Sequence, residues 1–128
     1  QKLPACNGKV AVGGFCWGGT QTFRFVSQHA GVKAGFVFYG SGSEDERELA
    51  KIQAPVYGFY GGNDARVNAT VPQSETLMKK VGKVYEPVIY EGAGHGFMRA
   101  GEDPAGSPEN KKARETAWKR LKQLLKGL

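Results

Sequence analysis

The chain has 128 residues, which is the length of one ordinary domain and leaves no room for a separate cofactor domain. Apolar residues make up 40% and charged residues 23%, and the apolar runs fall far short of the ~20 residues that cross a bilayer, so a disordered tail and an integral membrane protein are excluded. The net charge is +6, but residues 109–126 carry seven basic and two acidic side chains and so account for most of the excess. We therefore expect one soluble domain over residues 1–128, with neither a membrane nor a nucleic acid among its partners.

Cysteine usage bears on the compartment. Cys6 and Cys16 are the two cysteines, and no apolar run near the start of the chain resembles a signal peptide. A secreted disulfide framework in so short a chain would need more cysteines, so the composition favours a reducing cytoplasm. Glycine is abundant, with 19 residues and no repeating period, which places it in turns and at close approaches of the backbone.

Strand-like and helix-like runs alternate along the chain, which is typical of an α/β fold. The predicted strands are Lys9–Gly13, Val32–Tyr39, Val56–Tyr60 and Tyr85–Tyr90. The predicted helices are Trp17–His29, Glu44–Ile52, Gln73–Val81 and a last one that opens at Ser107-Pro108-Glu109. The predicted fold class is α/β, with a mostly parallel four-stranded sheet and flanking helices.

Two details place the later elements. Pro87 lies inside the fourth predicted strand and removes a hydrogen-bond donor, which favours an edge strand or a strand start. The last helix is amphipathic, which is typical of a terminal helix that docks on a sheet, although a membrane-surface or nucleic-acid helix has the same pattern. We expect the docked helix. Its apolar face consists of Ala113, Ala117, Trp118, Leu121, Leu124, Leu125 and Leu128.

The segment Gly14-Phe15-Cys16-Trp17-Gly18 matches the G-x-nucleophile-x-G elbow, with Cys in place of the usual Ser. It follows a β-branched strand and opens a predicted helix, which is the context that an elbow requires. In this strained turn, side chains at the two flanking glycine positions are expected to collide with neighbouring backbone. Cys16 is therefore the candidate nucleophile, and the alternative is a small buried hydrophobic residue.

A nucleophile of this kind needs a base and an acid that orients the base. His95 lies in the loop Gly92–Phe97 after the fourth predicted strand, and Asp64 ends the turn 61–64 after the third. The order nucleophile, acid, histidine is that of α/β-hydrolases, and each residue follows a strand end, where parallel sheets place their sites. The alternatives are a turn-forming Asp64 and a structural His95.

These residues resemble the dienelactone hydrolase family, also called carboxymethylenebutenolidases, within the α/β-hydrolase fold. The resemblance is carried by GFCWGG after a valine-rich strand, by the GGND turn and by GAGHGF, and it covers about Lys9 to Leu128. It implies a Cys-His-Asp triad that hydrolyses a small anionic ester or lactone, with Cys16 as nucleophile, His95 as base and Asp64 as orienting acid. We expect neither a cofactor nor a metal ion.

Two further roles are implied by the resemblance. Arg99, four residues after His95, matches an arginine that holds the substrate carboxylate in the family. Its alternative is an ordinary solvated loop arginine. Trp17, directly after the candidate nucleophile, is expected to supply one oxyanion-hole donor from its backbone N–H.

The resemblance covers only the C-terminal half of the longer family members, so their N-terminal strands and a second oxyanion donor have no counterpart here. One alternative is therefore a catalytically incomplete half-domain that serves as an assembly or folding module. The strand before the elbow would also be left with an open apolar edge. That edge predicts a homodimer or a higher oligomer, formed by sheet continuation or by exchange of an element between protomers.

Overall fold

The computed structural model describes residues 1–128 and contains a four-stranded sheet in the order β1-β2-β3-β4, with every neighbouring pair parallel. The strands are β1 (Ala11–Phe15), β2 (Ala34–Phe38), β3 (Val56–Gly61) and β4 (Tyr85–Tyr90). The helices are α1 (Trp17–Gln28), α2 (Glu46–Leu49), α3 (Ala65–Asn68), α4 (Val71–Lys80), α5 (Phe97–Ala100) and α6 (Pro108–Lys126). The predicted fold class is confirmed.

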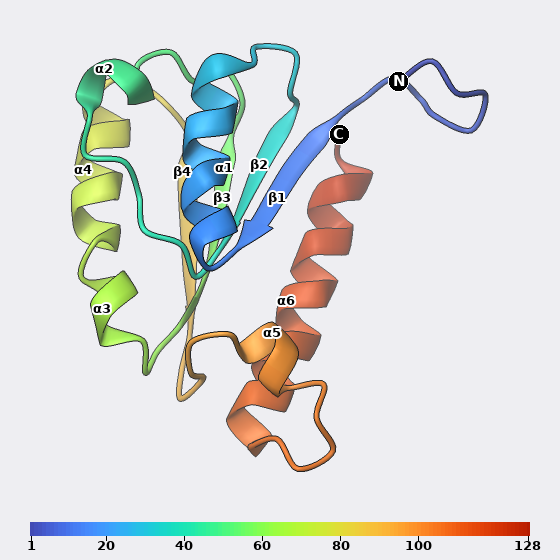
Figure 1. Cartoon of the computed structure of the whole chain (residues 1–128), viewed down its shortest axis with the longest axis vertical. Coiled ribbons are helices and arrows are strands. Elements are labelled where there is room, and N and C mark those ends of the chain that lie inside the picture. Colours follow the sequence, from blue (N-terminus) through green and yellow to red (C-terminus); the bar gives the residue numbers. More distant parts are fainter.

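The helices form a layer on each side of the sheet, with α1, α2 and α4 on one face and α6 on the other (Figure 1). Alternate residues of β2 point into the two layers, because Val37 belongs to the core beside α1 and α4 whereas Phe36 and Phe38 belong to the core beside α6. All 5 residues of β2 are buried, as an inner strand covered on both faces requires.

A row of aromatic rings runs across the sheet on the α6 side. Phe15 is the register partner of Phe38, which is the partner of Phe59, and the rings stack with centroids 4.6 Å and 4.3 Å apart. Arg120 of α6 lies over the Phe59 ring at 4.4 Å and donates to the Gly58 carbonyl at 2.7 Å. Stacking thus links β1, β2 and β3, and the cation–π contact ties α6 to β3.

Several predicted boundaries shift in the structure. β1 begins at Ala11 and continues to Phe15, because Gly14 and Phe15, which were expected to lie beyond the strand, are still paired with β2. The predicted helix Glu44–Ile52 is one turn long, since Asp45 caps it by accepting from the Arg47 N–H and the chain leaves the helix after Leu49. The short helices α3 and α5 were not predicted, because four residues are too few to show a helical period.

The two outer strands are β4 and β1. Pro87 lies in β4, so the predicted edge position is confirmed, and its missing N–H leaves no inner ladder bond unmade. β1 forms the other edge, with Gly13 and Phe15 exposed. The open edge predicted for the elbow strand is therefore present in this structure.

The last helix begins as predicted, with Ser107 as the cap, accepting from the Asn110 N–H at 3.2 Å. Its predicted apolar face is correct in part. Ala113 and Ala117 are buried, and the side chains that pack partly buried beside them are Leu121, Leu124 and Leu128. Trp118 and Leu125 are 37% and 45% exposed, so their predicted docking is wrong. The small alanine pair brings α6 close to the sheet and turns these two larger side chains outward. None of the helices has both the length and the apolar character needed to cross a bilayer.

Candidate active site

Cys16, Asp64 and His95 all lie at the carboxyl ends of the strands, at the end of the sheet where α3 and α5 pack (Figure 1). Cys16 follows β1 directly, Asp64 separates β3 from α3, and His95 lies between β4 and α5. Because parallel strands all end on the same side, residues far apart in the chain meet there. The sequence-based placement of all three at strand ends is confirmed.

The elbow at Cys16 is strained, with φ 54° and ψ −122°. A Cβ on Gly14 would lie 2.1 Å from the Gly18 carbonyl oxygen, and one on Gly19 would lie 2.8 Å from the Phe38 carbonyl oxygen. Glycine is therefore required at positions 14 and 19. The expectation that Gly18 is also required is wrong, since a Cβ there would meet open space.

Asp64 and His95 are paired. A carboxylate oxygen of Asp64 lies 2.5 Å from His95 Nδ1, and the Asp64 side chain is 6% exposed. The other carboxylate oxygen accepts from the Val67 N–H at 3.4 Å, so Asp64 also caps α3. Asp64 therefore has both of the roles considered for it, since it bonds to nearby backbone and also pairs with His95. With Nδ1–H donated to Asp64, Nε2 of His95 is left as the basic nitrogen.

The loop that carries His95 is held by residues that the sequence patterns did not indicate. A Cβ on Gly61 would lie 2.5 Å from the Gly94 carbonyl oxygen, so glycine lets the two loops touch. Asn63 donates from its backbone N–H to the Ala93 carbonyl at 2.9 Å. The Asn110 side chain accepts from the Gly94 N–H at 2.9 Å. Asn110 lies 16 residues from Gly94, beyond the reach of any local pattern.

One cavity of about 1100 Å³ brings the candidate residues together, and we call it the site cavity. Cys16 and His95 both line it. Its other lining residues are Phe15, Tyr39, Gly96, Met98, Arg99, Ala100, Glu102, Asp103, Pro104, Arg114 and Trp118. Two arginines, Arg99 and Arg114, line the same cavity as the candidate nucleophile Cys16.

Arg99 lies on α5 with an exposed side chain that makes no hydrogen bond or ion pair, so it is free to bind an anion. Arg114 of α6 is held in place, because its Nε donates to the Met98 carbonyl at 2.9 Å and its guanidinium lies 3.5 Å from Glu102. The sequence indicated Arg99 but gave no signal for Arg114, which comes from a helix expected only to pack on the sheet. Trp17 is the first residue of α1, so its backbone N–H has no partner within the helix.

Tyr39 is a further residue of the site cavity that sequence reasoning missed. It follows β2 directly, is 3% exposed and places its ring centroid 5.2 Å from that of His95. The pKa of Tyr39 is raised to about 12, chiefly by burial and also by negative charge on Cys16, whereas a hydrogen bond with the Met98 backbone lowers it. Its hydroxyl is therefore neutral at physiological pH.

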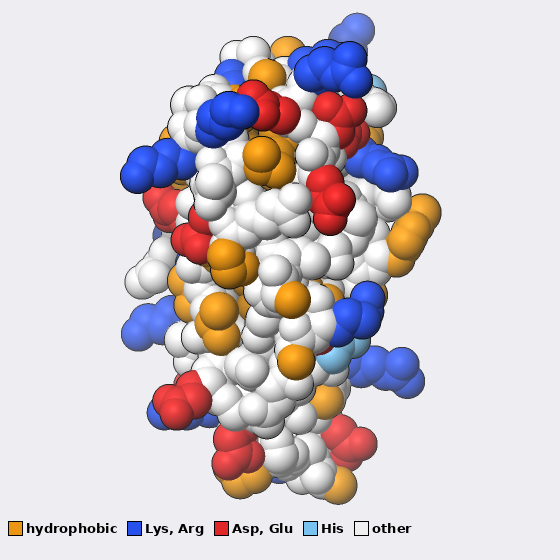
Figure 2. Space-filling model, turned by 90° about the vertical axis from the view of Figure 1, so that its left-hand side faces the viewer, with side chains coloured by type: hydrophobic (Ala, Val, Ile, Leu, Met, Phe, Trp, Pro, Cys, Tyr) orange, Lys and Arg blue, Asp and Glu red, His pale blue; other side chains and the backbone are white.

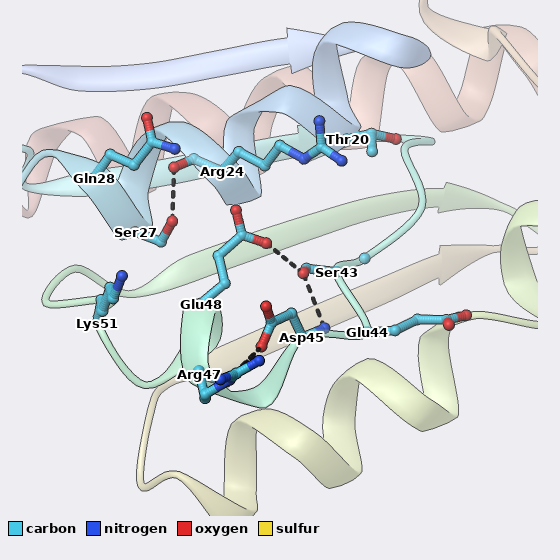
Figure 3. Close-up of a pocket in the computed structure, with 11 residues that line it drawn as sticks. Thr20, Arg24, Ser27, Gln28, Ser43, Glu44, Asp45, Arg47, Glu48 and Lys51 are labelled. Atoms are coloured by element: carbon cyan, nitrogen blue, oxygen red, sulfur yellow. Dashed lines mark hydrogen bonds and ion pairs between the residues drawn. The ribbon is translucent and has the colours of Figure 1, made fainter.

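A second hollow, of about 880 Å³, lies between α1 and α2, and we call it the polar hollow (Figure 3). No hydrophobic side chain lines it, and its polar groups bond to one another. Ser43 donates to Glu48 at 2.5 Å, and Arg47 lies 3.8 Å from Asp45. Acidic and basic side chains are interspersed over the face of the molecule that carries α1, α2 and α4 (Figure 2). Neither hollow holds a group of three His, Cys, Asp or Glu side chains suited to a metal ion.

Residues 1–128 match the model of the dienelactone hydrolase family. The chain belongs to this family. It is 33% identical over 118 residues to a "Putative carboxymethylenebutenolidase" of Saccharolobus solfataricus, covering 92% of this chain and 44% of the relative. It is 28% identical over 113 residues to the "Carboxymethylenebutenolidase homolog" of Mus musculus, covering 83% of this chain and 45% of the relative.

Solved structures agree with the family. The crystal structure of a "Putative Dienelactone Hydrolase" from Klebsiella pneumoniae superposes with a TM-score of 0.72 at 25% identity, over 86% of this chain and 49% of that one. A dienelactone hydrolase-like promiscuous phosphotriesterase from metagenomic libraries shares the fold, with a TM-score of 0.81 at 22% identity over 99% of this chain and 55% of that one. The chain spans less than half the length of the two curated relatives named above.

Proposed function

We propose that this chain hydrolyses small carboxylic esters or lactones by acyl transfer to Cys16, with His95 as base and Asp64 as orienting acid. The observation that carries the proposal is the buried Asp64 paired with His95, whose ring shares the site cavity with the strained Cys16. A strained non-glycine backbone persists only where the surrounding structure imposes it, and such positions cluster at functional sites. Family membership supports the same class of reaction.

In the proposed reaction, His95 Nε2 removes the proton from Cys16 Sγ, and the thiolate attacks the carbonyl carbon. The tetrahedral intermediate collapses, the C–O bond to the alcohol breaks, and His95 returns its proton to the departing oxygen. A thioester on Cys16 remains. Water, deprotonated by His95, then attacks the thioester carbonyl. The C–S bond breaks and His95 returns the proton to the sulfur, so the acid is released and the thiol is restored. For a lactone, the departing alkoxide stays attached to the acyl group.

Charge at the site cavity suggests the substrate. The free guanidinium of Arg99 supports a substrate that carries a carboxylate, because a bidentate pair would orient it. The unbonded N–H of Trp17 would stabilise the oxyanion, as donors at a helix N-terminus do. We therefore propose a small anionic ester or lactone as substrate.

The test is hydrolysis of p-nitrophenyl acetate by three proteins: the unchanged chain, Cys16→Ala and Cys6→Ser. The Cys16→Ala change is expected to abolish turnover above the buffer rate, whereas Cys6→Ser, which alters the other exposed cysteine, is expected to keep it. Iodoacetamide should inactivate the Cys6→Ser protein. A Cys16→Ala protein with undiminished rate would rule out the acyl-cysteine mechanism.

A second candidate function is assembly, since the β1 edge is exposed. Phe15 and Trp17 at this edge are 50% and 76% exposed. Such a pair of large apolar side chains beside unpaired strand backbone favours contact with another chain. We propose that a second copy of the chain binds there, and that the protein acts in the cytoplasm, where its two free cysteines would stay reduced.

Sedimentation equilibrium at micromolar concentration tests the assembly. Trp17→Lys is expected to weaken association, whereas Val84→Lys, at a residue 53% exposed just before β4, is the matched control and should not. A monomer of 13.8 kDa at all concentrations would contradict the proposal.

A further inference from the structure

Arg114 is fixed at the border of the site cavity by the close packing of α5 on α6. A Cβ on Gly101 would lie 2.9 Å from Arg114 Cβ and 2.3 Å from the Asn110 carbonyl oxygen, so glycine lets the end of α5 approach α6. There Arg114 Nε donates to the Met98 carbonyl at 2.9 Å. This contact orients the guanidinium and leaves the N–H groups of its two terminal nitrogens for other partners.

The guanidinium of Arg114 already lies beside a carboxylate, but the contact is loose. Glu102 Oε1 lies 3.5 Å from Arg114 Nη2, which is longer than the ~2.7–2.9 Å of a charge-assisted hydrogen bond. The Glu102 side chain is 72% exposed, whereas that of Arg114 is 29% exposed. An ion pair with so exposed a partner contributes little to stability, so another carboxylate can replace Glu102 at little cost.

Glu102 and Asp103 are the two acids that line the site cavity with the two arginines. Asp103 is engaged in its own turn, because its carboxylate accepts from the Ala105 N–H at 2.9 Å. Glu102 pairs with Arg114 alone, and Arg99 has no partner. Once Glu102 moves away, the cavity is therefore bordered by two guanidiniums without a counter-ion.

Positive charge is gathered beside Arg114. A depression of about 800 Å³, lined chiefly by α6, shares Arg114 and Trp118 with the site cavity. Glu115 is its one acid, against the basic residues Lys111, Arg114, Lys119, Lys122 and Lys126. A surface lined by one sign of charge raises the local concentration of ligands of the opposite sign. The approach to the site cavity along α6 therefore favours an anion.

We propose that Arg114 is a second carboxylate-binding residue of the site cavity, and that Glu102 occupies it until the carboxylate of the substrate takes its place. An arginine of α5 and one of α6 then bind the anionic part of the substrate together. The inference rests on the proposed function in one respect, namely that the bound carboxylate belongs to an ester or lactone. The exchange replaces one carboxylate by another, and no covalent bond forms or breaks in it.

The test is the binding of benzoate, a carboxylate without an ester bond, measured by isothermal titration calorimetry in about 0.15 M salt, where distant charges are screened. Arg114→Gln removes the guanidinium and is expected to weaken binding about tenfold, the value of a charge-assisted hydrogen bond. Glu102→Gln removes the competing carboxylate and is expected to tighten binding about two- to fivefold. Two substitutions of opposite sign should thus move the dissociation constant in opposite directions.

The matched controls are Lys119→Gln and Glu115→Gln, which make the same changes of charge on α6 outside the site cavity. Both are expected to leave the dissociation constant nearly unchanged. A Glu102→Gln protein that binds benzoate no more tightly than Glu115→Gln would overturn the proposal, and the exposed position of Glu102 makes this variant safe for folding. Equal weakening by Arg114→Gln and Lys119→Gln, or no saturable binding to the unchanged chain, would overturn it as well.

Benzoate binding requires no turnover, so the two proposals fail separately. The predicted shifts together with an undiminished rate in Cys16→Ala would support the carboxylate site and refute the proposed hydrolysis. An inactive Cys16→Ala protein without those shifts would do the reverse. Where both hold, Glu102→Gln is expected to lower KM for a carboxylated lactone, to leave its kcat unchanged and to spare the neutral methyl ester.

Discussion

The site cavity and the polar hollow are similar in size, at about 1100 and 880 Å³, and both contain arginines and acids, yet they are built differently. The site cavity takes residues from the ends of β1 and β2, from the loop after β4 and from α5 and α6. The polar hollow is lined by α1, by α2 and by the loop between β2 and α2, and it includes no strand end. Only the site cavity includes backbone with a positive φ at a non-glycine residue.

The acids of the two hollows show what this difference means. Asp45 in the polar hollow caps its own helix and lies beside Arg47, and their side chains are 55% and 94% exposed. Asp64 is 6% exposed and pairs with a histidine 31 residues away. An exposed ion pair between neighbours in sequence contributes little to stability. A buried carboxylate that is hydrogen-bonded to a histidine from a distant part of the chain is typical of a functional site. Charge and volume alone therefore do not distinguish a site from a hollow.

The largest contrast is expected between Asp64→Asn and Asp45→Asn. Asn at 64 cannot hold His95 in the tautomer that leaves Nε2 basic, so kcat is expected to fall by about 10³- to 10⁴-fold, as in other triads. Asp45→Asn should leave kcat unchanged. Measurement of kcat on one activated ester for both variants decides between them, and comparable losses would remove the distinction between the two acids.

Two glycines are expected to tolerate a methyl group differently: Gly61, which packs on the His95 loop, and Gly42, which lines the polar hollow. Gly61→Ala drives a Cβ to 2.5 Å from the Gly94 carbonyl oxygen, which is backbone, so we expect a loss of about 1–3 kcal/mol in unfolding free energy and a displaced His95. Gly42→Ala meets the Ser74 hydroxyl, which can rotate, and should cost less. Urea denaturation gives both unfolding free energies, and a larger loss for Gly42→Ala would contradict this view of the two glycines.

The two free arginines provide a smaller contrast. Arg99→Ala is expected to lower kcat/KM for a carboxylated lactone by about ten- to a hundredfold, the value of a charge-assisted hydrogen bond, and to spare the neutral methyl ester. Arg24→Ala in the polar hollow should change neither substrate. Equal losses for both substrates in Arg99→Ala would argue against carboxylate binding.

The smallest effect concerns alkaline pH. Burial raises the pKa of Tyr39 to about 12, above the ordinary value of 10, so the folded state keeps a proton that the unfolded chain loses first. The stability that this residue contributes is fully present below pH 10 and declines as the pH rises towards 12. Urea unfolding at pH 9, 10 and 11 should show a shallower decline for Tyr39→Phe than for the unchanged chain. Parallel declines would show that Tyr39 does not contribute.

The four strands, the elbow at Cys16 and the chain order of Cys16, Asp64 and His95 could all be predicted from local sequence patterns. These features are local, because a few neighbouring residues are enough to show them. Such residues reveal the period of a strand or helix, the glycines of a turn and the position of a side chain after a strand. The expectation that the three residues meet then needed one further rule, namely that parallel strands all end on the same side of the sheet. The main boundary errors fell where pairing with a distant strand extends a glycine-rich segment, as at Gly14 and Phe15.

Only the tertiary structure decided what surrounds those residues. Tyr39 meets His95 across 56 positions of sequence. Asn110 supports the His95 loop from α6, and Arg114 reaches the site cavity from the same helix, which was predicted to serve packing alone. Trp118 is exposed because the close approach of the alanine pair sets how α6 is rotated on the sheet. Each of these depends on contacts between segments that share no local pattern, since packing distance and helix rotation are properties of the assembled core.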